Sequence, residues 1–378
     1  MKEPETSKQS SSGLISTRYL LISLALSTVG MAVVIWMTWS PGVLEHLVPK
    51  RMPGLVIAIG VIFLRIWFVA AKIHFLAEKE ITWMGAVRVA LTWDFASAVT
   101  PSTIGGAPVA TYALTREGIR LGNSTAIVLY GVLLDQFWYA MAVPVLLIAG
   151  IWFEVIPSGT GMVGLVTMGI IYFGLLAYGA LLAYGLLVQP SALKKVVKTL
   201  LRFPFLRRFR EKVMVEAESL EQYSMELRAK PAGFIGKAFY FSTMAWLCRV
   251  AIPPIVVLSL LPAEEVLLIL RSLAMNLAFL VIPTPGGSGG VEGLFVVFMG
   301  PLIERTAFIG LAVFLWRVMT YYVSIGLGVM ATTWYVDHQV VKLVNNGDDS
   351  RDIGEDAEES NTPIPESENV LKRSGNRE

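Results

Sequence analysis

Long apolar runs alternate with short polar segments along most of the chain. Six runs are uninterrupted, and each has the roughly 20 residues that an α-helix needs to cross a bilayer. They are Tyr19–Trp39, Gly54–Leu76, Ser124–Ile151, Gly161–Val188, Gly233–Leu261 and Phe308–Trp334. The first run is too long for a signal peptide and is not followed by a small-residue cleavage site. The pattern predicts an all-α polytopic membrane protein with about six full spans.

Two further apolar runs are interrupted by proline and glycine. Trp83–Gly118 breaks at Thr100–Gly106, and Val266–Leu302 breaks at Pro283–Gly290. Proline ends the helix before it, and glycine permits positive φ and close backbone approach. We therefore expect two re-entrant, broken helical hairpins. The helix that follows each glycine pair would point its amides at an anion, above all phosphate. Close helix packing through small residues is the alternative.

The two interruptions share a pattern that indicates an internal repeat. Thr100–Gly106 reads Thr-Pro-x-x-x-Gly-Gly, and Thr284–Gly290 reads the same, an offset of 284 − 100 = 184 residues. The same offset places Arg65 on Arg249, each inside the run before its hairpin. One extra span lies between the two halves, so the second half enters the membrane with the opposite orientation to the first. We therefore predict an inverted-topology repeat whose hairpins meet at a mid-membrane binding site. A chance match of proline- and glycine-rich letters is the alternative.

Lysine and arginine are unevenly distributed between the loops, which predicts the orientation. The linker at 190–232 has eight of them between 194 and 212, whereas Glu154–Gly159 and Pro262–Glu265 have none. We expect a multi-pass protein of the cell (plasma) membrane with both termini and this linker in the cytoplasm. The exceptions to the rule are Lys50, Arg51 and Arg305. The linker is either an amphipathic surface helix or a solvated charge run.

Composition supports the membrane prediction and excludes several other classes. Only 16% of residues are charged, against roughly 25% in globular domains. The net charge of +2 divides into −6 for Asn345–Glu378, which has four bases and ten acids, and +8 for the rest. The single cysteine, Cys248, excludes an intrachain disulfide, and the three histidines lack metal-ligand spacing. We expect no cofactor, no metal and no nucleic acid.

These boundaries define the expected domains. We predict a disordered lead at 1–17, a single transmembrane domain at 18–335 and an acidic disordered tail at 336–378. The repeat halves within the domain are about 54–151 and 233–334.

Seven charged residues lie within the apolar runs: Arg65, Arg88, Asp94, Asp135, Arg249, Arg271 and Arg317. Each would cost at least about 2.5–3.5 kcal/mol facing lipid at the membrane centre, so all should face inward. Some could pair with each other, such as Arg88 with Asp94, or Asp135 with an arginine. These seven residues are five arginines and two acids, so positive charge is left over. A guanidinium is well suited to binding phosphate. Glu292 either caps its own helix or relays a proton or cation.

The predicted substrate site combines the two hairpins with these inward charges. It comprises Arg65, Arg249, Thr100, Pro101, Gly105, Gly106, Asp135, Arg271, Thr284, Pro285, Gly286, Gly287, Gly289, Gly290, Glu292 and Arg317. We predict no catalytic residue, because the sequence has no His/Asp cluster and no nucleophile and base at convincing spacing.

The segment Pro283–Glu292 resembles the signature of the flippase-like transmembrane family that includes the membrane part of lysylphosphatidylglycerol synthases. The resemblance covers about residues 15–335. In the first hairpin Gly105, Gly106 and Pro108 match the family, and Ala107 and Ala110 stand where it often has an acid and an arginine. The resemblance implies transbilayer movement of an aminoacylated phospholipid or a polyprenyl-phosphate-linked sugar. Only about 44 residues follow Trp334, so we expect no aminoacyl-transferring domain, and a chain that moves lipid without making it.

Three functions remain open from the sequence. The first is a lipid flippase or scramblase, driven by an ion gradient, the lipid's own gradient or a partner, because the chain has no Walker motif. The second is a secondary transporter of a soluble anion, and the third is an intramembrane enzyme acting on a lipid phosphate. The expected partner is a membrane lipid substrate. The sequence leaves open two protein partners, a second copy of this chain in a homo-oligomer or a separate lipid-synthesising enzyme.

Overall fold

The computed structural model describes residues 17–40, 51–100, 106–157, 161–189, 191, 210–279, 282, 284 and 286–335. These residues form helices joined by turns, with no β-strand among them. The chain divides into two compact units, Met1–Thr332 and Thr333–Glu378. Almost all of the lead at 1–17 and the whole tail at 336–378 lie outside the described residues, so their predicted disorder stays a prediction.

Within the described residues, six helices are long and apolar enough to cross a membrane. They are α1 (Thr17–Thr38), α2 (Pro53–Leu76), α5 (Leu121–Ala149), α6 (Gly161–Ala183, continued by a π-helical turn at Tyr184–Val188), α9 (Ala232–Leu260) and α12 (Ala307–Arg317, continued by a π-helical turn at Val318–Tyr322 and on to Tyr335). Each helix coincides with one of the six uninterrupted runs, which confirms the all-α polytopic prediction.

The two interrupted runs each form a pair of short helices. The first pair is α3 (Trp83–Val99) and α4 (Gly106–Arg116), and the second is α10 (Glu265–Ala278) and α11 (Gly290–Met299, followed by a 3-10 turn at Gly300–Leu302). α4 and α11 begin at residues separated by the repeat offset of 184. α10 ends five residues before the position that corresponds to the end of α3, so the second turn is the longer one.

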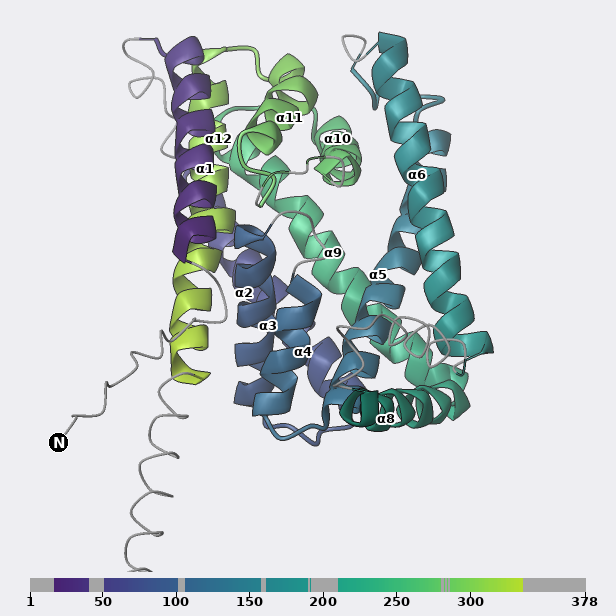
Figure 1. The fold of residues 1–378 in the computed structure, drawn as a ribbon. Coiled ribbons are helices and arrows are strands. Elements are labelled where there is room, and N and C mark those ends of the chain that lie inside the picture. The colour runs from purple at the N-terminus through teal and green to yellow at the C-terminus, as the bar shows by residue number, and fades with distance from the viewer. Residues whose placement is uncertain are drawn as a thin grey trace, which may run out of the picture. The chain divides into compact units, whose positions relative to one another are not determined.

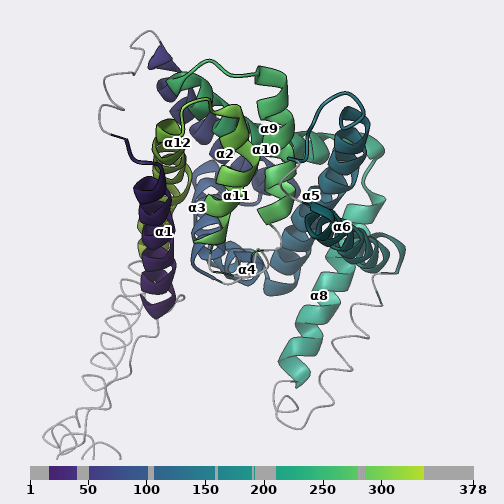
Figure 2. The same ribbon diagram turned by 90° about the horizontal axis from the view of Figure 1, so that it is seen from above.

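The short pairs lie at opposite ends of the first unit. In Figure 1, α3 and α4 lie at the end where α8 (Arg210–Ala229) crosses, and α10 and α11 lie at the other end. α2 precedes the first pair and α9 precedes the second, and these two helices pack along each other. α1 lies beside α12 in both views (Figures 1 and 2). This arrangement agrees with an inverted repeat, although the repeat itself and the re-entrant course through a membrane remain predictions.

Local sequence explains where these helices begin. Pro53 starts α2, where its missing amide proton costs nothing. Thr82 caps α3, because its hydroxyl accepts a hydrogen bond from the Gly85 amide at 3.0 Å. Gly106 begins α4 tightly against α3, since a Cβ here would collide with the Ser97 hydroxyl and the Trp93 ring.

The described part of the linker is an amphipathic helix, α8. One face is buried through Ala217, Leu220, Tyr223 and Leu227, at helical spacing. The Tyr223 hydroxyl donates to the Leu76 carbonyl at 2.9 Å, and burial raises the pKa of this phenol. α8 is therefore fixed to the end of α2, in keeping with the surface-helix alternative. Most basic residues of the linker fall within 192–209, outside the described residues.

Candidate binding site

A cavity of about 770 Å³ lies between the two short helix pairs. Trp93, Asp94 and Pro108 line it from the first pair, and Gly286 and Val291 line it from the second. α2, α5, α6, α9 and α12 with its π-helical turn supply further lining residues. The volume lies in the range of about 300–1,000 Å³ that is typical of small-molecule sites. The two short helix pairs therefore share one pocket.

The cavity is asymmetric along the helices. At the end where α8 lies, its lining reaches Leu121, an exposed residue at the beginning of α5. At the other end the lining stops at Phe279 and Trp316. Beyond them lies the apolar core, in which Phe295 stacks on Trp316 with ring centroids 5.1 Å apart and Phe298 is buried. The cavity thus extends toward the α8 end and is closed by packed side chains at the opposite end.

Both acids in the cavity wall have a basic partner on α2. Arg65 donates to both carboxylate oxygens of Asp94, at 2.9 and 2.7 Å. Lys72 lies seven residues later on the same face of α2 and donates to the two oxygens of Asp135 at 2.9 and 3.1 Å. The Trp246 indole also donates to Asp135, at 3.0 Å. These two ion pairs add no net charge to the cavity.

Arg249 differs from its repeat counterpart, Arg65. Its Nε donates to the Asn276 side-chain oxygen at 3.2 Å, and its guanidinium lies over the Trp246 ring at 5.3 Å. Among the described residues, Arg249 has no carboxylate within 4.0 Å. Each repeat arginine thus reaches the first helix of its own pair. In the first half the partner is the acid Asp94, whereas in the second half it is a neutral amide.

The charges of the cavity follow from these contacts. The described lining contains four bases and two acids: Arg65, Lys72, Arg249, Arg317, Asp94 and Asp135. Arg317 is paired with Glu292 behind the wall, with Nε 2.8 Å from the carboxylate. The sum, 4 − 2 − 1, leaves one positive charge, and Arg249 is the residue that carries it.

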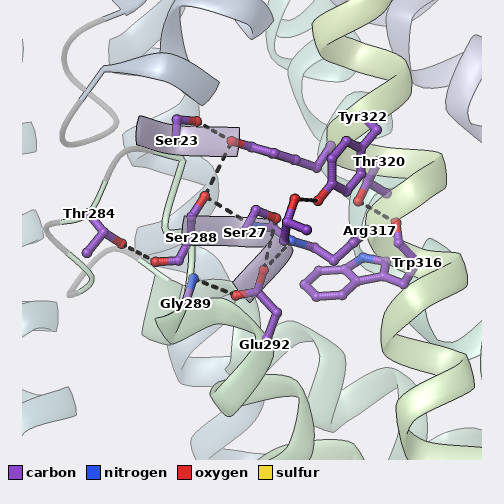
Figure 3. Close-up of polar contacts among 12 residues, drawn as sticks. Ser23, Ser27, Thr284, Ser288, Gly289, Glu292, Trp316, Arg317, Thr320 and Tyr322 are labelled. Carbon is purple, nitrogen blue, oxygen red and sulfur yellow. Dashed lines mark hydrogen bonds and ion pairs between the residues drawn. The ribbon is translucent and has the colours of Figure 1, made fainter. Parts of the chain in front are cut away.

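Glu292 caps α11 and neutralises Arg317 (Figure 3). Its carboxylate accepts from the Gly289 amide at 2.8 Å, from Arg317 Nε at 2.8 Å and from the Ser27 hydroxyl at 3.2 Å, and the residue is fully buried. The capping alternative for Glu292 is confirmed. The Arg317 guanidinium also lies over the Tyr321 ring at 4.2 Å, within the π-helical turn.

The turn before α11 needs glycine for two reasons. Gly286, Gly287 and Gly289 have φ values of +58°, +68° and +86°, a region that other residues rarely adopt. A Cβ on Gly286 would lie 2.5 Å from the Ala98 carbonyl oxygen near the end of α3. The second turn therefore contacts the first hairpin directly. The Ser23 hydroxyl of α1 donates to the same carbonyl at 2.9 Å.

The amides at the beginning of α11 already have acceptors. Gly289 donates to Glu292, and Gly290 and Val291 donate to the Gly287 carbonyl at 3.2 and 2.9 Å. The prediction that free amides at this helix end attract an anion was wrong for these three groups, because the glutamate cap and the tight turn satisfy them. These three amides are therefore not available to an anion.

The structure brings most of the predicted site residues together. Arg65, Asp135, Arg249, Thr284, Gly286, Gly287 and Arg317 line the cavity, and Gly289 and Glu292 support Arg317 from behind. Thr100 ends α3, where its hydroxyl donates to the Ala96 carbonyl, and Gly106 and Gly290 pack against neighbouring side chains. Pro101, Gly105 and Pro285 lie outside the described residues.

Arg271 lies apart from this group. It is buried, and it donates to the Glu154 carbonyl at 3.0 and 3.2 Å and to the Phe298 carbonyl at 3.2 Å. It is not among the residues that line the cavity. Its contacts tie the loop after α5 to the end of α11.

The ion pairs suggested by the sequence were wrong in their partners. Arg88 pairs with Glu117, with two contacts of 3.0 Å, rather than with Asp94. Six residues of helix separate Arg88 from Asp94, which turns the two side chains to different faces. Asp135 pairs with a lysine rather than an arginine. Lys72 was missed, although its spacing of seven from Arg65 could have indicated a second inward cation.

Comparison with known proteins agrees with the fold and the motif. The model of the lysylphosphatidylglycerol synthase transmembrane region matches residues 19–328. A UPF0104 membrane protein of Archaeoglobus fulgidus is 24% identical over 316 residues, which cover 79% of this chain and 90% of that protein. In the described part of the chain, no group of three or more His, Cys, Asp or Glu residues could hold a metal ion. The chain belongs to the family of the lysylphosphatidylglycerol synthase transmembrane region.

Proposed function

We propose that this protein moves a phosphate-bearing lipid across the bilayer and that Arg249 binds the phosphate. The observation that carries the proposal is the net positive charge of the cavity, which remains on Arg249 because its partner in α10 is Asn276 rather than an acid. A guanidinium binds phosphate through parallel, charge-assisted hydrogen bonds. Family membership supports a lipid as the carrier of that phosphate.

The shape of the cavity supports a transport role. It extends toward the α8 end and is closed at the other by the core around Phe295 and Trp316. In our proposal the headgroup enters from the α8 end, the cytoplasmic side, while its tails stay in lipid. Separation of α10 and α11 from the core would then open the opposite side, as inverted repeats allow. The protein moves lipid in the cell membrane and does not make it.

Reconstituted liposomes test this function. The protein is inserted into vesicles with a fluorescent phospholipid or a prenyl-phosphate sugar, and accessibility to a membrane-impermeant quencher reports transbilayer movement. Wild type should increase the accessible fraction. Arg249→Leu should lower the rate by about ten- to a hundredfold, because a charged hydrogen bond contributes about 1.5–3 kcal/mol.

Arg305→Leu is the matched control, since it removes the same charge from an exposed position outside the cavity lining. Its rate should equal that of wild type. Equal rates for Arg249→Leu and wild type would refute the role of Arg249. No movement of any lipid, together with uptake of free phosphate, would assign the cavity to a soluble anion instead.

A further inference from the structure

Each acid in the cavity wall is already neutralised by a base of the protein. Arg65 donates to both oxygens of Asp94, and Lys72 donates to both oxygens of Asp135. These are the only acids among the described lining residues. The parts of the two hairpin turns that lie outside the described residues contain no aspartate or glutamate; they are 101–105, 280, 281, 283 and 285. The cavity therefore offers no free carboxylate to a positively charged ligand group.

Two aromatic rings of the cavity wall are also engaged by cations of the protein. A cation binds over an aromatic ring when it lies within about 6 Å of the ring centre. Arg249 lies over the Trp246 ring at 5.3 Å, and Arg317 lies over the Tyr321 ring at 4.2 Å. Both rings line the cavity. Each of them already holds a guanidinium where a ligand ammonium would otherwise bind.

The hydroxyl groups of the wall can accept hydrogen bonds without changing the charge of the cavity. Five lining hydroxyls each donate to a backbone carbonyl, at 2.6–3.0 Å: Thr111, Thr125, Thr284, Thr320 and Ser324. A hydroxyl that donates its proton in this way keeps lone pairs that accept a hydrogen bond. These groups therefore suit a ligand whose alcohol groups donate.

We propose that the cavity selects a phosphodiester lipid whose headgroup is uncharged beyond the phosphate, such as a glycerol or a sugar. The phosphate neutralises the free charge of Arg249, and the alcohol groups donate to the hydroxyls of the wall. An ammonium on the headgroup would instead add a positive charge that no free carboxylate neutralises. This inference rests on the proposed function and separates the two lipids that the family resemblance implies. A phosphate-linked sugar fits the cavity, whereas an aminoacyl group adds an ammonium.

Two short-chain lipids with the same phosphodiester test this selectivity at neutral pH. Dioctanoyl phosphatidylglycerol ends in alcohol groups, and dioctanoyl phosphatidylethanolamine ends in an ammonium. The first should bind roughly fifteen- to fiftyfold more tightly, the effect of one unit charge roughly 7–10 Å from Arg249 at an effective dielectric constant of about 20. Dioctanoyl phosphatidylmethanol keeps the negative charge without the alcohol groups. It should bind roughly two- to tenfold more weakly than phosphatidylglycerol, the loss of one neutral hydrogen bond.

Two charge changes in the cavity should move the ratio of the phosphatidylglycerol and phosphatidylethanolamine affinities in opposite directions. Asn276→Asp gives Arg249 an acidic partner and should bring the ratio close to one. Asp94→Asn frees Arg65 as a second cation and should raise the ratio, and it introduces no new buried carboxylate. Asn123→Asp, in the first turn of α5 and outside the cavity lining, should keep the wild-type ratio. Thermal unfolding of the same samples identifies the folded variants.

Dioctanoylglycerol, which has no phosphate, separates this inference from the proposed function. If wild type binds phosphatidylglycerol and phosphatidylethanolamine equally, and both more tightly than dioctanoylglycerol, the selectivity is overturned while the phosphate function stands. A ratio that stays unchanged in both cavity variants would also overturn the selectivity. If phosphatidylglycerol binds no more tightly than dioctanoylglycerol, the phosphate function itself fails. Equal binding of phosphatidylmethanol and phosphatidylglycerol would refute the contacts assigned to the alcohol groups.

Discussion

Asn276→Asp tests the free charge of Arg249 with a minimal change in shape. The substitution places a carboxylate where the amide oxygen now accepts from Arg249 Nε at 3.2 Å. The second half would then have the ion pair that Arg65 and Asp94 form in the first half. We expect the variant to fold and to lose affinity for phosphate, because it removes the net charge of the cavity.

The size of the loss follows from the distances. A phosphate on the far side of the guanidinium would lie roughly 7 Å from the new carboxylate, where two unit charges repel by about 2.4 kcal/mol at an effective dielectric constant of about 20. That energy corresponds to about fiftyfold in affinity. Stability should change less, because the new ion pair offsets the lost donation from the Asn276 amide to the Ser272 carbonyl at 2.9 Å.

Binding of dioctanoyl phosphatidylglycerol and thermal unfolding are measured on the same samples. Asn123→Asp is the matched control, the same chemical change in the first turn of α5, outside the cavity lining. The double variant Asp94→Asn/Asn276→Asp transfers the free charge from Arg249 to Arg65 and should recover binding to within about tenfold of wild type. Unchanged affinity in Asn276→Asp would refute the role assigned to the unpaired arginine.

Three further substitutions separate fold from function. Gly286→Val should prevent folding or lipid movement in the quencher assay, because φ is +58° and its Cβ would lie 2.5 Å from a carbonyl of α3, whereas Gly60→Val, with open space around it, should be tolerated. Glu292→Gln should lower the free energy of unfolding by about 3–5 kcal/mol by leaving Arg317 charged and buried, and adding Arg317→Met should recover most of that loss in thermal unfolding. Arg271→Met should lower the unfolding temperature, because the buried Phe298 carbonyl and the partly buried Glu154 carbonyl lose their donor. The folded fraction should bind dioctanoyl phosphatidylglycerol like wild type; weaker binding would return Arg271 to the site.

The sequence predicted the helices and the breaks because both depend on local signals. Apolar length fixed the six spans, and proline and glycine placed the breaks before Gly106 and Gly290, where α4 and α11 begin. The repeat offset also paired Arg65 with Arg249, and both line the cavity. These features need no knowledge of which helices touch.

The sequence did not predict the partners of the buried charges, because those depend on how helices pack across the cavity. Glu117, which pairs with Arg88, lies 29 residues later in the sequence, just after the end of α4. Asp135, which pairs with Lys72, lies 63 residues later in the sequence. Asn276, which leaves Arg249 charged, is an ordinary amide in an apolar run and carries no signal by itself. The identity of the free cation therefore required the three-dimensional arrangement.

A structure determined with bound dioctanoyl phosphatidylglycerol tests the central claim most directly. We expect the phosphate within hydrogen-bonding distance of the Arg249 guanidinium, between the turn at Gly286 and the first hairpin, with the acyl chains leading out of the cavity. A phosphate bound at the basic surface of the protein, with the cavity empty or filled by acyl chains, would contradict it.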